Sequence, residues 1–302
     1  MLSRGVSGFR VSRIVRRLNG ANMRSKDPVT HPEGPVVSLT SYGGRVNTVY
    51  LTIEAIAEGR VLPSRLILWL DDEAVFNRLP HSLLQLQRRG LEVRLAGNYG
   101  PHTKYYPYVE TTDHLSLPLI TADDDILYPR HWLEGLVQAY TERPDLINCY
   151  RARVIQLEAV GLSPYLSWQM CNSTEPTIRH FATGVSGVVY PPAFLAFLKQ
   201  AGPLFMGCCP KADDIWLHVQ ALRSGYQVRQ FVKRFLHFPM IPGTQHTALQ
   251  ISNWGNPGIG NDRQAAMTYS QQDLDVLWRA VGGRSPGVDG RLDQQFTRSE
   301  AQ

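Results

Sequence analysis

Short apolar runs alternate with amphipathic segments through the first half of this 302-residue chain, and no other feature restricts its fold as strongly. The segments of strand length are the apolar runs 35–40, 65–70 and 117–122, and the segment 91–95, in which apolar and charged residues alternate. The segments 46–58 and 81–89 between them carry apolar residues at helical spacing. Repeated strand–helix–strand units predict an α/β fold of the Rossmann-like type, with a mainly parallel sheet flanked by helices.

The second half of the chain is less regular. Strands are expected over 147–151, 185–190 and 227–232, and helices over 193–199 and 213–224. From Phe238 onward the chain is rich in Pro, Gly, Asn and Gln, which predicts an irregular C-terminal part that closes over a site. The expected organisation is a basic extension over 1–30, a single domain over 31–280 with halves 31–145 and 146–280, and a flexible tail over 281–302.

The N-terminal segment is strongly basic. The formal net charge of the chain is +5, and its first 26 residues contain basic residues but no acidic one. Interleaved apolar residues would suit a short amphipathic helix that lies on an anionic membrane. A disordered basic tail is the alternative interpretation, and Gly5, Gly8 and Gly20 favour it.

Features that mark exported or membrane-spanning chains are missing from the sequence. No apolar run reaches the ~20 residues that a membrane-spanning helix needs. No continuous apolar stretch of the kind found in secretory signals follows the basic residues. The four cysteines lack C-x-x-C spacing, so a disulfide network is not expected. The sequence therefore predicts a cytoplasmic protein, with peripheral contact to the inner membrane face if its N-terminus binds lipid.

Three consecutive aspartates, Asp123, Asp124 and Asp125, follow the apolar run 117–122, at the point where a buried strand would end. Like charges this close repel one another, and burying any of them is unfavourable without a partner. Mg²⁺ and Mn²⁺ prefer oxygen ligands and commonly connect carboxylates to a diphosphate. The cluster therefore predicts a divalent metal cofactor and chemistry on phosphate esters.

Polar residues also follow the other predicted strands. The segment 40–45 follows the first strand, and Asp71 and Asp72 follow the second. Ligands of parallel sheets bind outside the carboxyl ends of the strands, so these groups should share one edge with the three aspartates. Lys104 lies between two strands that end there, and its ammonium group would neutralise a diphosphate. Asp72 has a second interpretation, as the N-cap of a helix over 73–77.

Together these motifs resemble the GT-A glycosyltransferases, and bacterial family 2 and polysaccharide-assembly enzymes in particular. The resemblance covers about residues 35 to 240, and the D-x-D pattern Asp123–Asp125 and the segment 212–216 carry most of it. It implies hexosyl transfer, of a mannosyl, galactosyl or glucosyl group, from a GDP- or UDP-hexose to a glycan or glycolipid hydroxyl. The halves 31–145 and 146–280 would then bind the nucleotide sugar and the acceptor.

The resemblance also assigns roles to single residues. Asp213 and Asp214 are the catalytic candidates, and Asp214 is preferred as general base, although helix capping is the alternative role. His237 is preferred over His246 as the histidine that completes a metal site. Nucleotide-sugar binding is expected from Thr40, Ser41, Tyr42, Arg45, Asp72, Lys104, Asp123 and Asp124, metal binding from Asp123, Asp125 and His237, and acceptor binding from Gly184, Ser186 and Trp216.

Three other functions fit parts of the sequence. A sugar-nucleotide pyrophosphorylase shares the fold, but its glycine-rich signature after the first strand is missing. A nuclease is disfavoured because the chain lacks a broad basic face with interleaved aromatics, so no nucleic-acid partner is expected. A non-catalytic glycan- or nucleotide-binding scaffold would keep the fold without needing both acidic clusters. The donor, the acceptor, the stereochemistry and the formation of a homo-oligomer stay open at this stage.

Overall fold

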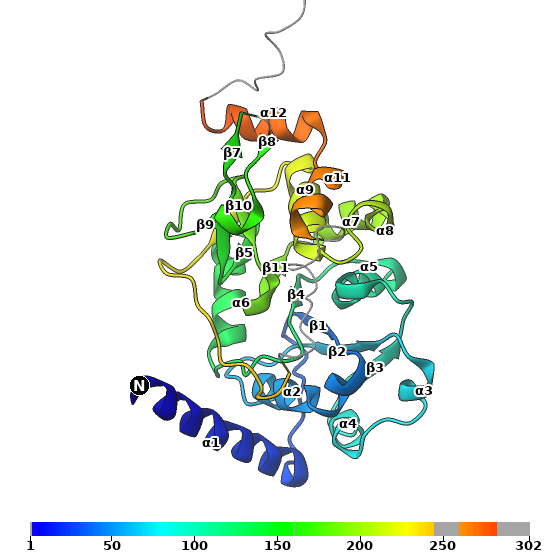
Figure 1. Cartoon of the computed structure of the whole chain (residues 1–302). Coiled ribbons are helices and arrows are strands. Elements are labelled where there is room, and N and C mark those ends of the chain that lie inside the picture. Colours follow the sequence, from blue (N-terminus) through cyan, green and yellow to red (C-terminus); the bar gives the residue numbers. More distant parts are fainter. Residues whose placement is uncertain (1, 160, 245–259, 283–302) are drawn as a thin grey trace, which may run out of the picture.

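The computed structural model describes residues 2–159, 161–244 and 260–282 (Figure 1). At its centre lies a seven-stranded sheet with the strand order β12-β5-β11-β4-β1-β2-β3. Every strand of this sheet except β11 runs in the same direction. The bounds are β1 Val36–Thr40, β2 Arg65–Leu70, β3 Leu91–Leu95, β4 Leu119–Thr121, β5 Ile147–Cys149, β11 Val188–Tyr190 and β12 Val228–Gln230. The predicted α/β class with a mainly parallel sheet is confirmed.

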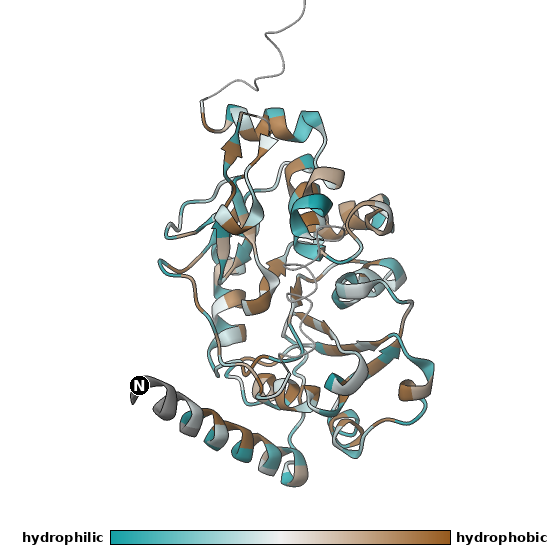
Figure 2. Ribbon diagram, viewed as in Figure 1, coloured by the Kyte–Doolittle hydropathy of each residue, from teal (hydrophilic) through white to brown (hydrophobic). Residues whose placement is uncertain are grey.

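Helices cover both faces of the sheet because its central strands are apolar on both sides. In β2, Leu66 and Leu68 pack into one buried cluster while Ile67 and Trp69 pack into the other. Figure 2 shows this concentration of apolar residues in the central strands. The first face is covered by α2 Val49–Ala57, α4 His81–Gln87 and α6 Trp132–Glu142, and the second by α5 Tyr106–Thr111, α7 Pro192–Ala201 and α9 Asp213–Arg223.

Smaller elements surround this core, and several were not predicted. A three-stranded antiparallel sheet has the order β10-β6-β9, and β7 pairs with β8. The strands are β6 Ala152–Val154, β7 Leu157–Glu158, β8 Gly161–Leu162, β9 Gln169–Met170 and β10 His180–Ala182. The short helices are α3 Glu73–Phe76 and α8 Phe205–Cys208, with 3-10 turns η1 Gly43–Asn47, η2 Gly100–Lys104, η3 Tyr165–Ser167 and η4 Gly184–Ser186. Strands of two to three residues are too short to give a periodic signal.

The N-terminal segment corrects the expectation of a disordered tail. Residues Leu2–Arg24 form helix α1. Leu18 is fully buried against Leu51 and Ala55 of α2, and the Asn22 amide donates to the Glu54 carboxylate (3.0 Å). Packing of this face against the body stabilises a helix whose glycines lower its intrinsic propensity.

The C-terminal part is also more regular than expected. The segments α11 Asn261–Thr268 and α12 Gln271–Arg279 are helical, and a capping box between Ser270 and Asp273 begins α12. Residues 283–302 of the expected tail 281–302 lie outside the described residues, as does His246. No helix within the described ranges is long and apolar enough to cross a membrane.

Candidate functional site

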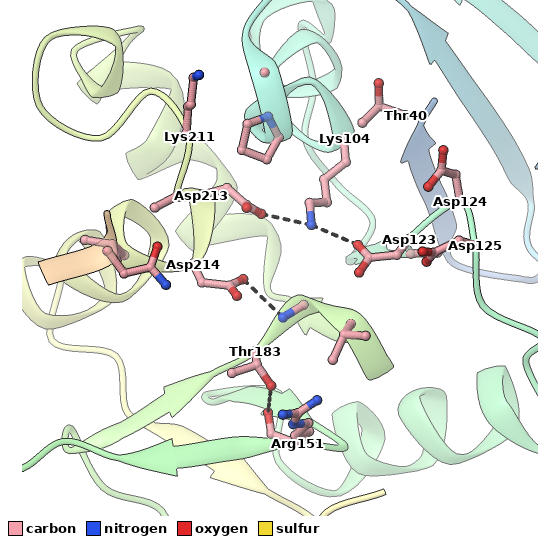
Figure 3. Close-up of a pocket in the computed structure, with 18 of the residues that line it drawn as sticks. Thr40, Lys104, Asp123, Asp124, Asp125, Arg151, Thr183, Lys211, Asp213 and Asp214 are labelled. Atoms are coloured by element: carbon pink, nitrogen blue, oxygen red, sulfur yellow. Dashed lines mark hydrogen bonds and ion pairs between the residues drawn. The ribbon is translucent and has the colours of Figure 1, made fainter. Parts of the chain in front are cut away.

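A cleft of about 790 Å³ opens at the carboxyl edge of the central sheet (Figure 3). The loops that follow β1, β2, β4, β5 and β12 contribute to its walls because these strands all end at this edge. The reversed strand β11 begins there, which places the preceding η4 turn in the same wall. The parallel topology therefore brings the polar clusters of the sequence together, as predicted.

The loop after β1 meets the second and third aspartates. The Ser41 hydroxyl donates to Asp124 Oδ2 (2.6 Å), and the Arg45 guanidinium contacts the carboxylates of both Asp124 and Asp125. Burial raises the pKa of Asp124 to about 7, although the charge of Arg45 opposes this shift. Burial lowers the pKa of Arg45, but the two carboxylates outweigh this, so its pKa is raised. Arg45 thus stays charged and holds both aspartates in place.

Lys104 lies at the centre of the cleft wall, at the end of η2. Its ammonium group is 3.0 Å from a carboxylate oxygen of Asp123 and 3.0 Å from one of Asp213. The side chain is 10% exposed, and burial alone would lower its pKa. The charges of the surrounding aspartates instead raise the pKa of Lys104 well above its usual value. Lys104 is therefore a permanent cation between two acidic groups that are 90 residues apart in the chain.

The Lys104 turn is anchored by a buried histidine. His102 is fully buried and stacks on Phe205 with ring centroids 3.9 Å apart. Its Nε2 lies 2.8 Å from the Cys209 carbonyl oxygen and its Nδ1 lies 3.0 Å from the Tyr105 hydroxyl. Burial lowers the pKa of His102 to about 3, so the ring is neutral and donates from Nε2 to the carbonyl. These contacts fix the backbone from which Lys104 extends.

Asp213 and Asp214 begin α9 and have different environments. Both line the cleft, but Asp213 is buried against Lys104, whereas Asp214 is half-buried and accepts a hydrogen bond from the Gly184 backbone N–H (3.1 Å). Burial raises the pKa of both carboxyl groups, and for Asp214 the charge of Asp213 adds to the shift. A carboxylate with a raised pKa that faces a cleft is able to accept a proton near neutral pH.

Gly184 lies close to both Lys104 and Asp214, and its lack of a side chain allows this close contact. A Cβ atom added at Gly184 would lie 3.1 Å from the Lys104 ammonium nitrogen and 3.2 Å from Asp214 Oδ1. His237 also lines the cleft, and burial, followed by the nearby charge of Arg151, lowers its pKa. Predicted candidates from both halves of the chain therefore surround one cavity.

Some predicted site residues lie elsewhere. Asp72 does not line the cleft, because its side chain caps α3 by accepting from the Val75 N–H (3.1 Å), and its neighbour Asp71 faces the cavity instead. Ser186 is buried and donates to the Leu236 carbonyl (2.7 Å). Trp216 is packed in the apolar core on the inner side of α9. The placement of Ser186 and Trp216 therefore corrects their assignment to acceptor binding.

The expected metal ligands do not form a complete protein cage. Asp125 is ion-paired with Arg45 and Asp123 with Lys104, and no three His, Cys, Asp or Glu side chains of residues 2–159, 161–244 and 260–282 converge on one point. Mg²⁺ is often held by one or two carboxylates together with substrate phosphates. The partly exposed Asp123 carboxylate fits that arrangement, in which the cation binds together with a phosphate ligand.

Other cleft residues were missed by the sequence analysis. Arg151 follows β5 and Arg153 lies in β6, and both side chains line the cavity together with Lys211. The position of Arg151 at the end of the predicted strand 147–151 was a usable signal, because strand ends form the site. Arg153 belongs to the small antiparallel sheet, whose short strands gave no signal.

Comparisons with known proteins add little beyond the fold. No protein-family model matches the chain, and no curated protein does. A similar solved structure is that of CMP:2-keto-3-deoxy-manno-octonic acid synthetase complexed with CTP. It is 14% identical to this chain, the match covers 72% of this chain and 98% of the other, and the TM-score is 0.42.

This comparison corrects the expectation of a hexosyltransferase. The similar structure belongs to a synthetase that holds CTP, and its name refers to no hexosyl transfer. What the structure of this chain establishes is an α/β fold of the Rossmann-like type with an acidic and cationic cleft at its carboxyl edge.

Proposed function

We propose that the protein is a nucleotidyltransferase that binds a nucleoside triphosphate and a sugar in the cleft. The observation that carries this proposal is the Lys104 ammonium group, held between Asp123 and Asp213 at the carboxyl edge of the sheet. A fixed cation in this position would stabilise the charge of a polyphosphate without having to reorganise. The nucleotide sugar expected from the sequence is then the product.

The reaction is a displacement at phosphorus. A hydroxyl oxygen of the sugar attacks the α-phosphorus, the bond from that phosphorus to the bridging oxygen breaks, and pyrophosphate leaves with the bonding electrons. The hydroxyl proton passes to Asp214, whose raised pKa and place in the cleft suit a general base. A divalent cation held by Asp123 and the phosphates would neutralise charge on the leaving pyrophosphate.

The nucleotide would be positioned by the loop after β1. The Tyr42 side chain lines the cleft, and Arg45 lies over its ring with the guanidinium carbon 5.7 Å from the centroid. This loop lacks the glycine-rich signature of sugar-nucleotide pyrophosphorylases. Stacking on Tyr42 and contacts to Arg45 would therefore replace the backbone cradle that such a signature provides.

Pyrophosphate release tests this function. The purified protein is mixed with each of CTP, UTP, GTP, ATP and dTTP, with Mg²⁺ or Mn²⁺, and with a panel of neutral and anionic sugars. We expect release with one nucleotide and one class of sugar, and none when EDTA removes the metal. Tight nucleotide binding without any pyrophosphate release would instead indicate a non-catalytic scaffold.

We further propose that α1 attaches the protein to an anionic membrane surface. Val11, Ile14, Val15 and Leu18 face the body of the protein. The exposed residues Arg10, Arg13, Arg16 and Arg24 lie on the opposite side of the helix, and no acidic residue accompanies them within α1. A basic helix face of this kind is attracted by anionic lipids, by about 1 kcal/mol per basic residue.

Replacing Arg10, Arg13 and Arg16 together by glutamine is expected to weaken binding to vesicles that contain phosphatidylserine by about 100-fold, from the loss of three such contributions. Co-sedimentation with these vesicles and with neutral phosphatidylcholine vesicles measures the effect. The matched control replaces three exposed arginines outside α1, Arg78, Arg263 and Arg279. Equal loss in the control, or equal binding to neutral vesicles, would refute the proposal.

A further inference from the structure

A second cationic group lies in the cleft, away from Lys104. Arg151 follows the end of β5, and Arg153 is the central residue of β6. In the register of the small sheet, Arg153 pairs with Phe181 on one side and Met170 on the other, and all three side chains line the cleft. Figure 3 shows Arg151 beside Thr183 and away from Lys104. The two arginines therefore belong to the wall opposite the nucleotide loop.

Arg151 and Arg153 are partly buried, and their partners differ from those of three other cations with little exposure. Arg45, Lys104 and Arg89 each contact at least one carboxylate. Within the described part of the chain, neither Arg151 nor Arg153 forms an ion pair. Their charges are therefore not neutralised by direct contact with an acidic side chain.

Their remaining contacts leave hydrogen-bond capacity unused. The guanidinium carbon of Arg151 lies 5.5 Å from the Phe235 ring centroid, and that of Arg153 lies 5.2 Å from the Tyr165 ring centroid. Arg153 also donates to the Trp168 carbonyl oxygen (2.8 Å). The Nε atom of each arginine is buried without a hydrogen-bond partner among the described residues. The neighbouring aromatic rings therefore hold both guanidinium groups without satisfying all of their hydrogen-bond donors.

The electrostatics of this wall favour an anion. Burial, followed by the charge of Arg153, lowers the pKa of Arg151, and Asp214 is close enough to oppose this in part. Two like charges in a partly buried site repel one another, and an oxyanion between them would relieve both the repulsion and the unsatisfied donors. Guanidinium groups bind carboxylate and phosphate groups with paired hydrogen bonds.

We propose that Arg151 and Arg153 form the subsite for an anionic substituent, a carboxylate or a phosphate, on the sugar substrate. This inference rests on the proposed function, since it assigns the second substrate of the same cleft. Asp214 interacts electrostatically with both Lys104 and Arg151, so it lies between the two cationic groups. A sugar anchored through its anion at the arginines would have a hydroxyl group near Asp214 and near the nucleotide.

The test measures binding of glucuronate, glucose 1-phosphate and glucose by calorimetry, to the full chain with and without its nucleotide and metal. We expect one or both anionic sugars to bind at least 10-fold more tightly than glucose. The Arg151→Gln variant should lose at least 10-fold of that affinity, because charged hydrogen bonds contribute this much. Its nucleotide affinity should stay within about threefold of the wild-type value.

Controls separate this inference from the proposed function. Arg143→Gln removes a partly exposed arginine outside the cleft, which is ion-paired with Asp145, and should leave the affinities for the anion and the nucleotide unchanged. The Arg151→Lys variant keeps the positive charge but loses the planar guanidinium group with its paired N–H donors. It should bind the anion with intermediate affinity. Unchanged anion affinity in Arg151→Gln, or equal binding of glucose, overturns the subsite. Anion binding that depends on Arg151 in a protein that binds no nucleotide would instead overturn the nucleotidyltransferase assignment and keep the subsite.

Discussion

Replacing Lys104 by methionine is expected to lower the free energy of unfolding by about 3–5 kcal/mol at pH 8, the usual effect of removing one partner of a buried ion pair. The side chain is buried between Asp123 and Asp213, and Asp214 is near. Without the ammonium group, these carboxylates stay close together with no compensating cation. Urea unfolding of the variant and the wild type, at several pH values, measures the loss.

The pH dependence distinguishes this cause from a simple loss of packing. Burial already raises the pKa of Asp213 and Asp214, and removing Lys104 raises both further. Below these raised pKa values the folded variant takes up protons that the unfolded chain binds only at lower pH. The difference in the free energy of unfolding between the wild type and the variant therefore becomes smaller as the pH falls from 8 to 5. Lys199→Met, at an exposed lysine, is the matched control. A deficit that is constant with pH would show that charge is not the cause.

The second large effect is expected from Asp214→Asn, which should lower the rate of pyrophosphate release at least ~100-fold, the scale of a lost general base. Asparagine has nearly the same shape, and its Oδ1 is still able to accept the hydrogen bond from the Gly184 N–H. Nucleotide affinity should therefore stay within a factor of about three. Single-turnover rates and equilibrium binding of the nucleotide, measured on the same protein, separate the two quantities.

Asp275→Asn, in α12 and away from the cleft, serves as the control for this change. If nucleotide affinity collapses in Asp214→Asn while the rate at saturation is kept, Asp214 is a binding residue and the assignment of the base is wrong. A profile of rate against pH gives a second check, because the pKa of Asp214 is raised to about 8 and the wild type should lose activity as the pH falls through that value. The rate of the Asp214→Asn variant should not show this fall.

The fold was predictable where sequence periodicity is strong. Strand-length segments at β1, β2 and β3 alternate with helices, and the parallel order follows from that pattern. The meeting of Arg45 with Asp124 and Asp125 at one edge followed from the same topology. Helix α1 was not predictable, because its glycines disfavour a helix and its stability comes from contacts of Leu18 with distant residues.

The details of the site depended on three-dimensional contacts that no local pattern encodes. The ion pair of Lys104 with Asp213 joins residues on separate helical segments and requires the completed sheet. Asp71 and Asp72 are adjacent and chemically identical, and only the start of α3 decides that Asp72 caps a helix while Asp71 faces the cleft. Arg153 of the second wall lies in a sheet whose strands are too short to predict.

The most direct test of the central claim is the melting temperature of the protein with nucleotides and metal ions. The ligands are the nucleoside triphosphates CTP, UTP, GTP, ATP and dTTP and the corresponding nucleoside diphosphates. Each is added together with Mg²⁺, Mn²⁺ or EDTA. At 100 times the dissociation constant, binding to the folded state contributes about 2.7 kcal/mol, which raises the melting temperature by roughly 5 °C or more. The account predicts this rise for one nucleotide, only when metal is present, and no rise with metal alone. No shift with any nucleotide would contradict it.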